Sequence, residues 1–163
     1  RFRGFRHDPS KDAPICRWIM DFSGVALKVD AMPVAKEIFG FTNRWYKGSI
    51  DTAWQLEIRK NLFINVIDPV YFLATKIEAF KGRGNNELFS HDIEDIVYVL
   101  ENRSEIERDL VRAPSELKEY LSVEFRDISR HPDLSNILPG ILENPDASDK
   151  VLSTIRFISS LAA

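Results

Sequence analysis

The chain has 163 residues, enough for one domain with a real core or for one α/β domain followed by a helical appendage. Hydrophobic residues make up 44% and charged residues 29%, and a formal charge of −3 without runs of like charge gives no support for a dedicated nucleic-acid binder. The single cysteine, Cys16, excludes an intramolecular disulfide and fits a reducing, cytoplasmic compartment. No apolar stretch approaches the ~20 residues of a membrane-spanning helix, so no membrane partner is expected.

The opening residues, 1–6, run directly into patterned sequence without Met and without the apolar region of a signal peptide. This opening indicates a truncated chain, a processed chain or a chain from which disordered residues have been left out.

Alternating apolar residues predict two β-hairpins in the first half of the chain. The first joins residues 15–20 to residues 25–31 through a turn at 21–24. The second spans residues 53–67, with its turn at Lys60-Asn61.

Capping residues predict where the helices begin. Asp68 and Pro69 are typical of an N-cap and a first helical position, and this helix should end at Gly82-Arg83-Gly84. Ser90 caps the next helix, and Ser104 with Glu107 forms a capping box for a short third one.

Beyond residue 115 the pattern is helical only. Apolar residues at helical spacing predict a longer helix ending before Pro132, then one short helix and a final helix carrying Val151, Leu152, Ile155 and Ile158.

The fold class is therefore α+β: a small mixed, hairpin-rich sheet flanked by helices, then an all-helical region. We expect an α/β part at residues 1–102 and a helical part at residues 103–163.

Asp30 is the first candidate for chemistry. Val25, Leu27 and Val29 share one face of their strand, so Lys28 and Asp30 share the other. A carboxylate late in a strand is well placed at a sheet edge to hold a metal ion. Alternatively, Asp30 is a solvated residue that starts a turn.

Lys76 and Arg83 are the second candidates. They are seven residues apart, which places them on nearly one face of a helix that continues that far. A lysine with an arginine suits a phosphate group. Alternatively, both are solvated cations near a helix C-terminus, where the helix dipole favours them.

Asp92 and Asp95 are the third candidates, one turn apart at the start of the next helix. They face away from its apolar stripe, so they could hold Lys76, orient a nucleophile or act as a base. Alternatively, they are acids that the dipole favours in any first turn.

Other signals are weaker. His7, His91 and His131 lack the spacing of zinc ligands. The polar and aromatic residues at 43–46 fit either a binding loop or packing anchors before the second hairpin.

Six segments taken together resemble one family, the AbiEii/AbiGii-toxin-type nucleotidyltransferases of the DNA polymerase beta-like superfamily. The resemblance covers residues 2–105, and its most telling part is Leu-Ala-x-Lys-x-x-Ala followed by Asp-x-x-Asp. The segments are Gly4-Phe5, APICRW at 13–18, VDAMP at 29–33, GFTNRWY at 40–46, PVYFLATKIEAF at 69–80 and SHDIEDI at 90–96.

The resemblance implies transfer of a nucleotidyl group from a nucleoside triphosphate to RNA or protein, with Mg²⁺ held by three carboxylates. Asp30 matches the third carboxylate and the metal ligand. Lys76 matches the lysine that neutralises triphosphate charge, with Arg83 in support. Asp92 matches the downstream acidic motif, with Asp95 as the second candidate. A role as a toxin with an antitoxin partner is also implied.

The sequence departs from the family at its start, where no Gly-Ser followed by Asp-x-Asp precedes Gly4. Because two-metal catalysis needs several oxygen ligands, the chain as given is expected to be inactive. A non-catalytic nucleotide-binding or protein-interaction remnant is the alternative, and an unrelated structural domain is the third. An incomplete sheet would also expose an edge through which the chain forms homo-oligomers.

Overall fold

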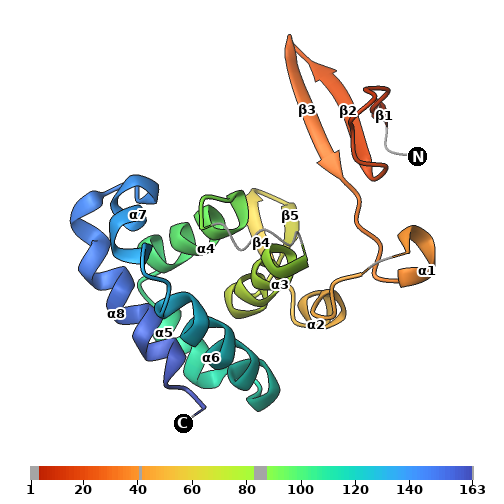
Figure 1. Ribbon diagram of the computed structural model, residues 1–163. Coiled ribbons are helices and arrows are strands. Elements are labelled where there is room, and N and C mark those ends of the chain that lie inside the picture. Colours follow the sequence, from red (N-terminus) through yellow and green to blue (C-terminus); the bar gives the residue numbers. More distant parts are fainter. Residues whose placement is uncertain (1–3, 41, 83–87, 163) are drawn as a thin grey trace. The chain divides into compact units, whose positions relative to one another are not determined.

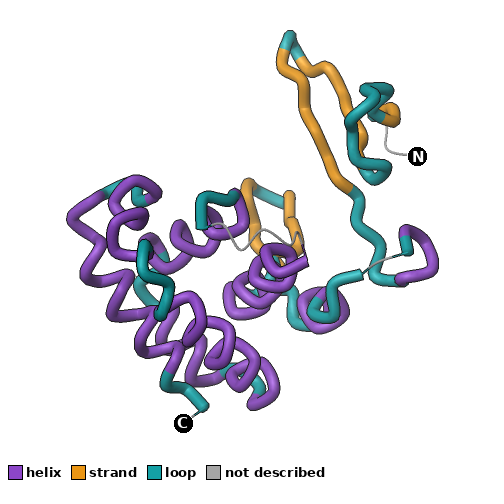
Figure 2. Tube along the Cα trace, in the orientation of Figure 1, coloured by secondary structure: helices purple, strands orange, loops and turns teal. Residues whose placement is uncertain are grey.

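The computed structural model describes residues 4–40, 42–82 and 88–162. They form two compact units, Arg1–Thr42 and Asn43–Ala163, called here the N-terminal and the C-terminal unit. Strands are confined to the region before α3, and helices dominate after it (Figure 1, Figure 2). The α+β class is confirmed. The expected boundary between residues 102 and 103 falls inside the C-terminal unit.

The N-terminal unit is an antiparallel sheet of order β1-β2-β3, followed by one short helix. Ser23 and Gly24 form the turn between β2 and β3, with φ of 54° and 80°. Two positive φ values match the twist of the strands that such a turn joins, and Gly24 adopts this backbone without strain. The elements are β1 (Arg6–His7), β2 (Arg17–Phe22), β3 (Val25–Asp30) and α1 (Lys36–Phe39).

The C-terminal unit begins with a short helix, α2 (Tyr46–Asp51), and the second hairpin, β4 (Trp54–Arg59) and β5 (Leu62–Val66). Both predicted hairpins are confirmed. The described strands form two separate antiparallel sheets, however, and the expected single mixed sheet is not seen among them. A β-bulge between Glu57 and Arg59 interrupts the second hairpin.

Helices α3 (Pro69–Gly82) and α4 (His91–Asn102) begin where their caps predict. The Asp68 carboxylate accepts hydrogen bonds from the backbone N–H groups of Val70 at 2.8 Å and Tyr71 at 3.3 Å. Ser90 Oγ accepts one from Ile93 at the start of α4. These bonds satisfy N–H groups that have no partner within the helix.

The remaining helices cover α3 and α4 with one apolar core, whose buried members run from Trp45 to Ile158. Leu73, Leu100, Leu121 and Phe125 are completely buried there. Helices α6 and α8 pack along each other, and α3 contacts α4, α5 and α6. The elements are α5 (Ile106–Arg112), α6 (Ser115–Ser129), α7 (Leu134–Ile141), the 3-10 helix η1 (Pro145–Ala147) and α8 (Ser148–Ser159).

One local prediction fails, and two short helices were not predicted. Helices α1 and α2 have only four and six residues, too short for a helical apolar pattern to show, and both were missed. The capping box of Ser104 and Glu107 is wrong, because Glu105 is the N-cap residue and makes no side-chain cap hydrogen bond. The Glu107 carboxylate instead accepts a long hydrogen bond, 3.5 Å, from the Thr154 hydroxyl of α8.

Within the described ranges, no helix has the length and hydropathy that crossing a membrane requires.

Gly48 offers a test of the packing between α2 and α3. A Cβ at this position would lie closest to Cε1 of Tyr71 and 2.9 Å from its Cζ, and real Cβ contacts shorter than 3.0 Å essentially never occur. We expect Gly48→Ala to lower the free energy of unfolding by about 1–3 kcal/mol, because the Tyr71 ring must shift. Urea unfolding followed by circular dichroism at the helix band measures the change.

Gly140→Ala is the matched control, since Gly140 is also helical and a Cβ there would meet nothing within 4 Å. This variant should keep or slightly raise stability, by up to about 1 kcal/mol, through helix propensity alone. Equal behaviour of the two variants would contradict the close approach of Tyr71.

Candidate functional site

Lys76 lies on α3 and meets two carboxylates at the start of α4. Its Nζ is 3.6 Å from Asp92 Oδ1 and forms a closer ion pair with Asp95 Oδ2. The stem of Lys76 leaves a helix whose neighbouring Leu73 and Ile77 are buried, so the backbone that carries the ammonium is fixed by the core. The expected grouping of Lys76, Asp92 and Asp95 is therefore present.

The three groups differ in exposure. The Asp92 side chain is only 2% exposed, Lys76 is 27% exposed and Asp95 is 45% exposed. Asp92 lies in the first turn of α4, where the helix dipole favours a negative charge. Lys76 also lies 5.5 Å from the centre of the Phe72 ring, a distance compatible with a cation–π contact. Asp92 thus faces the ammonium from the buried side of the site, and Asp95 is the more exposed of the two carboxylates.

The surface beside Asp95 is acidic. A cavity of about 260 Å³ next to it is lined by residues of α4 and by the chain around the end of α7, including Glu94, Glu101 and Glu143. Among the described side chains here, four carboxylates outnumber the two nearby ammonium groups, those of Lys76 and of Lys150, whose Nζ donates to the Glu101 carbonyl at 2.7 Å, so the local charge is negative. A bare polyanion would be repelled there, whereas an anion already neutralised by a divalent cation would not.

Asp30 has a different partner. At the end of β3 its two carboxylate oxygens accept hydrogen bonds from Arg17 Nε and Nη2, both at 2.8 Å. Arg17 lies directly opposite Asp30 in the register of the hairpin. The Arg17 guanidinium holds the pKa of the Asp30 carboxyl below its ordinary value, chiefly through these hydrogen bonds.

This pairing bears on whether Asp30 is available to a metal ion. A bidentate arginine occupies both oxygens of Asp30, the only residue expected to bind a metal directly. Among the residues that the structure describes, no cluster of three or more His, Cys, Asp or Glu side chains could hold a metal ion. A magnesium site built from these side chains alone does not fit.

The site candidates are thus distributed between the two units. Lys76, Asp92 and Asp95 come together in the C-terminal unit, and Asp30 pairs with Arg17 in the N-terminal unit. Arg83 lies outside the described residues.

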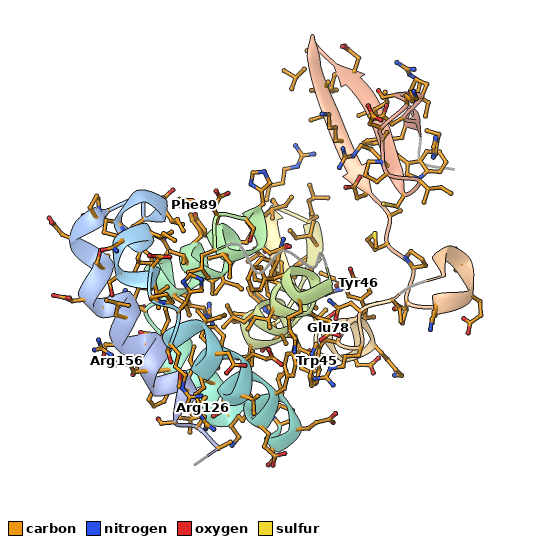
Figure 3. All side chains as sticks on the ribbon, in the orientation of Figure 1. Trp45, Tyr46, Glu78, Phe89, Arg126 and Arg156 are labelled. Atoms are coloured by element: carbon orange, nitrogen blue, oxygen red, sulfur yellow. The ribbon has the colours of Figure 1, made fainter. Side chains whose placement is uncertain are left out.

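A second charged cluster, which no sequence pattern predicted, surrounds Arg44. Its guanidinium lies 4.8 Å from the Trp45 ring and 4.2 Å from the Tyr120 ring, and its Nε is 3.6 Å from Glu78. The Tyr120 hydroxyl donates a hydrogen bond of 2.8 Å to Glu78. Trp45 and Glu78 are among the side chains labelled in Figure 3. Burial raises the pKa of Tyr120, and its bond to Glu78 raises it further.

These contacts decide between the two interpretations of residues 43–46. Trp45 is 7% exposed and belongs to the core, and the Asn43 side chain donates to the carbonyl of Thr75 on α3 at 2.8 Å. The segment therefore contains packing anchors. The contact of Arg44 with Tyr120 could not be read from the sequence, because it joins residues 76 positions apart.

A search for similar proteins finds no matching family model, no matching curated protein and no matching solved structure. The resemblance to nucleotidyltransferases therefore rests on the motifs of the chain itself.

The unequal burial of Asp92 and Asp95 leads to a prediction about stability. Asp92→Asn removes a buried charge that faces Lys76 and should lower the free energy of unfolding by about 1–3 kcal/mol. Asp95→Asn removes a half-exposed partner and should cost less than about 1 kcal/mol. Urea unfolding of the two variants provides the comparison, and a larger loss for Asp95→Asn would contradict the arrangement.

A second prediction concerns the pKa of Asp30. Carbon-13 NMR titration should give a value below 3.8 in the parent chain, and Arg17→Gln should return it to the ordinary range. Because the folded pKa is lowered, the stability from this pair is complete above the unfolded pKa and is lost as the pH falls through the folded one. Lys28→Gln is the control, since Lys28 contributes least to the shift, and an equal rise in that variant would refute the role of Arg17.

Proposed function

We propose that this chain belongs to a nucleotidyltransferase-like protein and that its C-terminal unit binds the magnesium complex of a nucleoside triphosphate. The observation that carries the proposal is the Lys76 ammonium, held between α3 and α4 by Asp92 and Asp95 and still 27% exposed. A fixed, partly exposed ammonium is suited to a phosphate group, because its position does not have to be organised on binding.

The acidic surroundings explain why the ligand would be a magnesium complex. Mg²⁺ is commonly bound by one or two carboxylates together with phosphate oxygens and water. In the proposed complex the phosphates supply most of the oxygen ligands, Asp95 approaches the metal, and Lys76 contacts a phosphate. Asp92 remains buried and keeps the lysine in place.

The proposal is for binding, and no catalytic step is derived for the described residues. Transfer of a nucleotidyl group by two metal ions requires several fixed oxygen ligands, whereas Asp30 is engaged by Arg17. An RNA or protein acceptor and an antitoxin follow only from the family resemblance. The assignment of the two hairpins to an incomplete nucleotidyltransferase sheet has the same basis.

Thermal unfolding with and without ligand tests the proposal. In Mg²⁺, one or more of ATP, GTP, CTP and UTP should raise the Tm by several degrees, since a ligand at 100 times its Kd stabilises by about 2.7 kcal/mol. The shift should disappear in Lys76→Ala and when EDTA removes the Mg²⁺.

Lys81→Ala is the matched control. Lys81 lies on the same helix and is also paired with a carboxylate, Glu124 of α6, so its loss disturbs packing in a comparable way. This variant should keep the nucleotide-dependent shift. A shift that neither lysine variant changes, or no shift with any of the four nucleotides, would refute a site at Lys76.

A further inference from the structure

The outer edge of β3 is a regular strand edge without a partner in its own sheet. Strand order in the N-terminal unit is β1-β2-β3, so no described segment of that unit pairs with the far side of β3. All six residues of β3 keep continuous register with β2. The second hairpin differs, because a β-bulge interrupts it, and such a bulge is one of the devices that blunt an edge.

The hydrogen bonding of β3 shows which backbone groups face outward. The Ala31 N–H donates to the Cys16 carbonyl at 2.9 Å, directly after β3. Because the bonding direction alternates along a strand, odd-numbered residues of β3 bond to β2. Ala26 and Lys28 therefore direct their N–H and C=O groups towards the free edge.

The side chains of β3 alternate as well. Val25, Leu27 and Val29 share one face and are 59%, 38% and 38% exposed. Their partners on β2 extend this apolar face, since Phe22, Met20 and Trp18 lie opposite them. A sheet this small gains stability from additional strands.

We propose that a second copy of this chain pairs with β3 in antiparallel orientation, with Leu27 of each copy facing Leu27 of the other. The two sheets then form one continuous sheet around a two-fold axis. This proposal concerns the N-terminal unit alone and does not depend on nucleotide binding.

The alternation of the strand selects this register. In an antiparallel two-fold pair, opposite residues point to the same side of the sheet, so apolar residues face apolar residues. Centring the axis on Leu27 places Val25 opposite Val29 and Ala26 opposite Lys28, and it pairs five residues of each strand. The outward backbone groups of Ala26 and Lys28 then bond to each other across the axis, as a hydrogen-bonded pair requires.

Neighbouring registers are less favourable. An axis at Lys28 would place two ammonium groups opposite each other, and like charges directly opposite destabilise a sheet. An axis at Val29 would leave Val25 unpaired and would bring Asp30, already bound to Arg17, into the pairing. With the axis at Leu27, Asp30 lies opposite Gly24 of the other copy and keeps its hydrogen bonds to Arg17.

Disulfide trapping tests the register directly. In the proposed dimer Leu27 is a non-hydrogen-bonded pair, with Cα atoms about 4.5 Å apart, which a disulfide can span. Leu27→Cys in a Cys16→Ala background should yield a covalent dimer under mild oxidation, and Lys28→Cys should yield far less. Equal trapping at both positions, or trapping at Lys28 alone, would overturn the register.

Sedimentation velocity tests the association without any cysteine. The parent chain should be dimeric at micromolar concentration, and Leu27→Lys should raise the dimer Kd at least tenfold. Phe22→Lys is the control, because Phe22 lies on the same apolar face but on β2, away from the edge, and is 63% exposed. A monomeric parent overturns the proposal, and so does equal weakening by both variants, which would indicate face-to-face packing of the sheets.

Discussion

Burial of helix α3 is the interaction on which the C-terminal unit depends. Leu73, Ala74 and Ile77 are buried almost completely, and the helix contacts α2, α4, α5 and α6. Residues on its flanks form the charged contacts: Lys76 meets the carboxylates of α4, and Glu78 meets Arg44 and Tyr120. A shift of α3 would therefore move both charged clusters together, since their geometry is inherited from the apolar packing between them.

The same helix orders the segment that precedes it. Asn43 donates to the Thr75 carbonyl, Trp45 enters the core, and Gly48 allows the Tyr71 ring to lie against α2. Arg44 is then held over Tyr120 with Glu78 as its carboxylate partner. A short helix with no strong pattern of its own is thus positioned by contacts made further along the chain.

The N-terminal unit follows a different principle. Its sheet is organised by local pairing across the Ser23-Gly24 turn and by the Arg17–Asp30 ion pair, while the apolar side of β3 stays exposed. Within the hairpin all residues of β3 are paired with β2 in continuous register, whereas the apolar face of the hairpin is not buried. This imbalance makes the free edge of β3 a natural place for a further strand.

The sequence by itself determined the hairpins, the starts of α3 and α4 and the apolar stripes of the later helices, because each depends on alternation, helical spacing or a cap within a few residues. It also singled out Lys76, Asp92 and Asp95 as one group. Only the tertiary structure decided that Arg17 binds Asp30, that Arg44 stacks on Tyr120 and that Glu107 faces α8 in place of capping its own helix. The contacts of Arg44 and Glu107 join residues distant along the chain and are selected by the packing of the core, which no local pattern records. The Arg17–Asp30 pair depends on the register of the first hairpin, which alternation alone does not set.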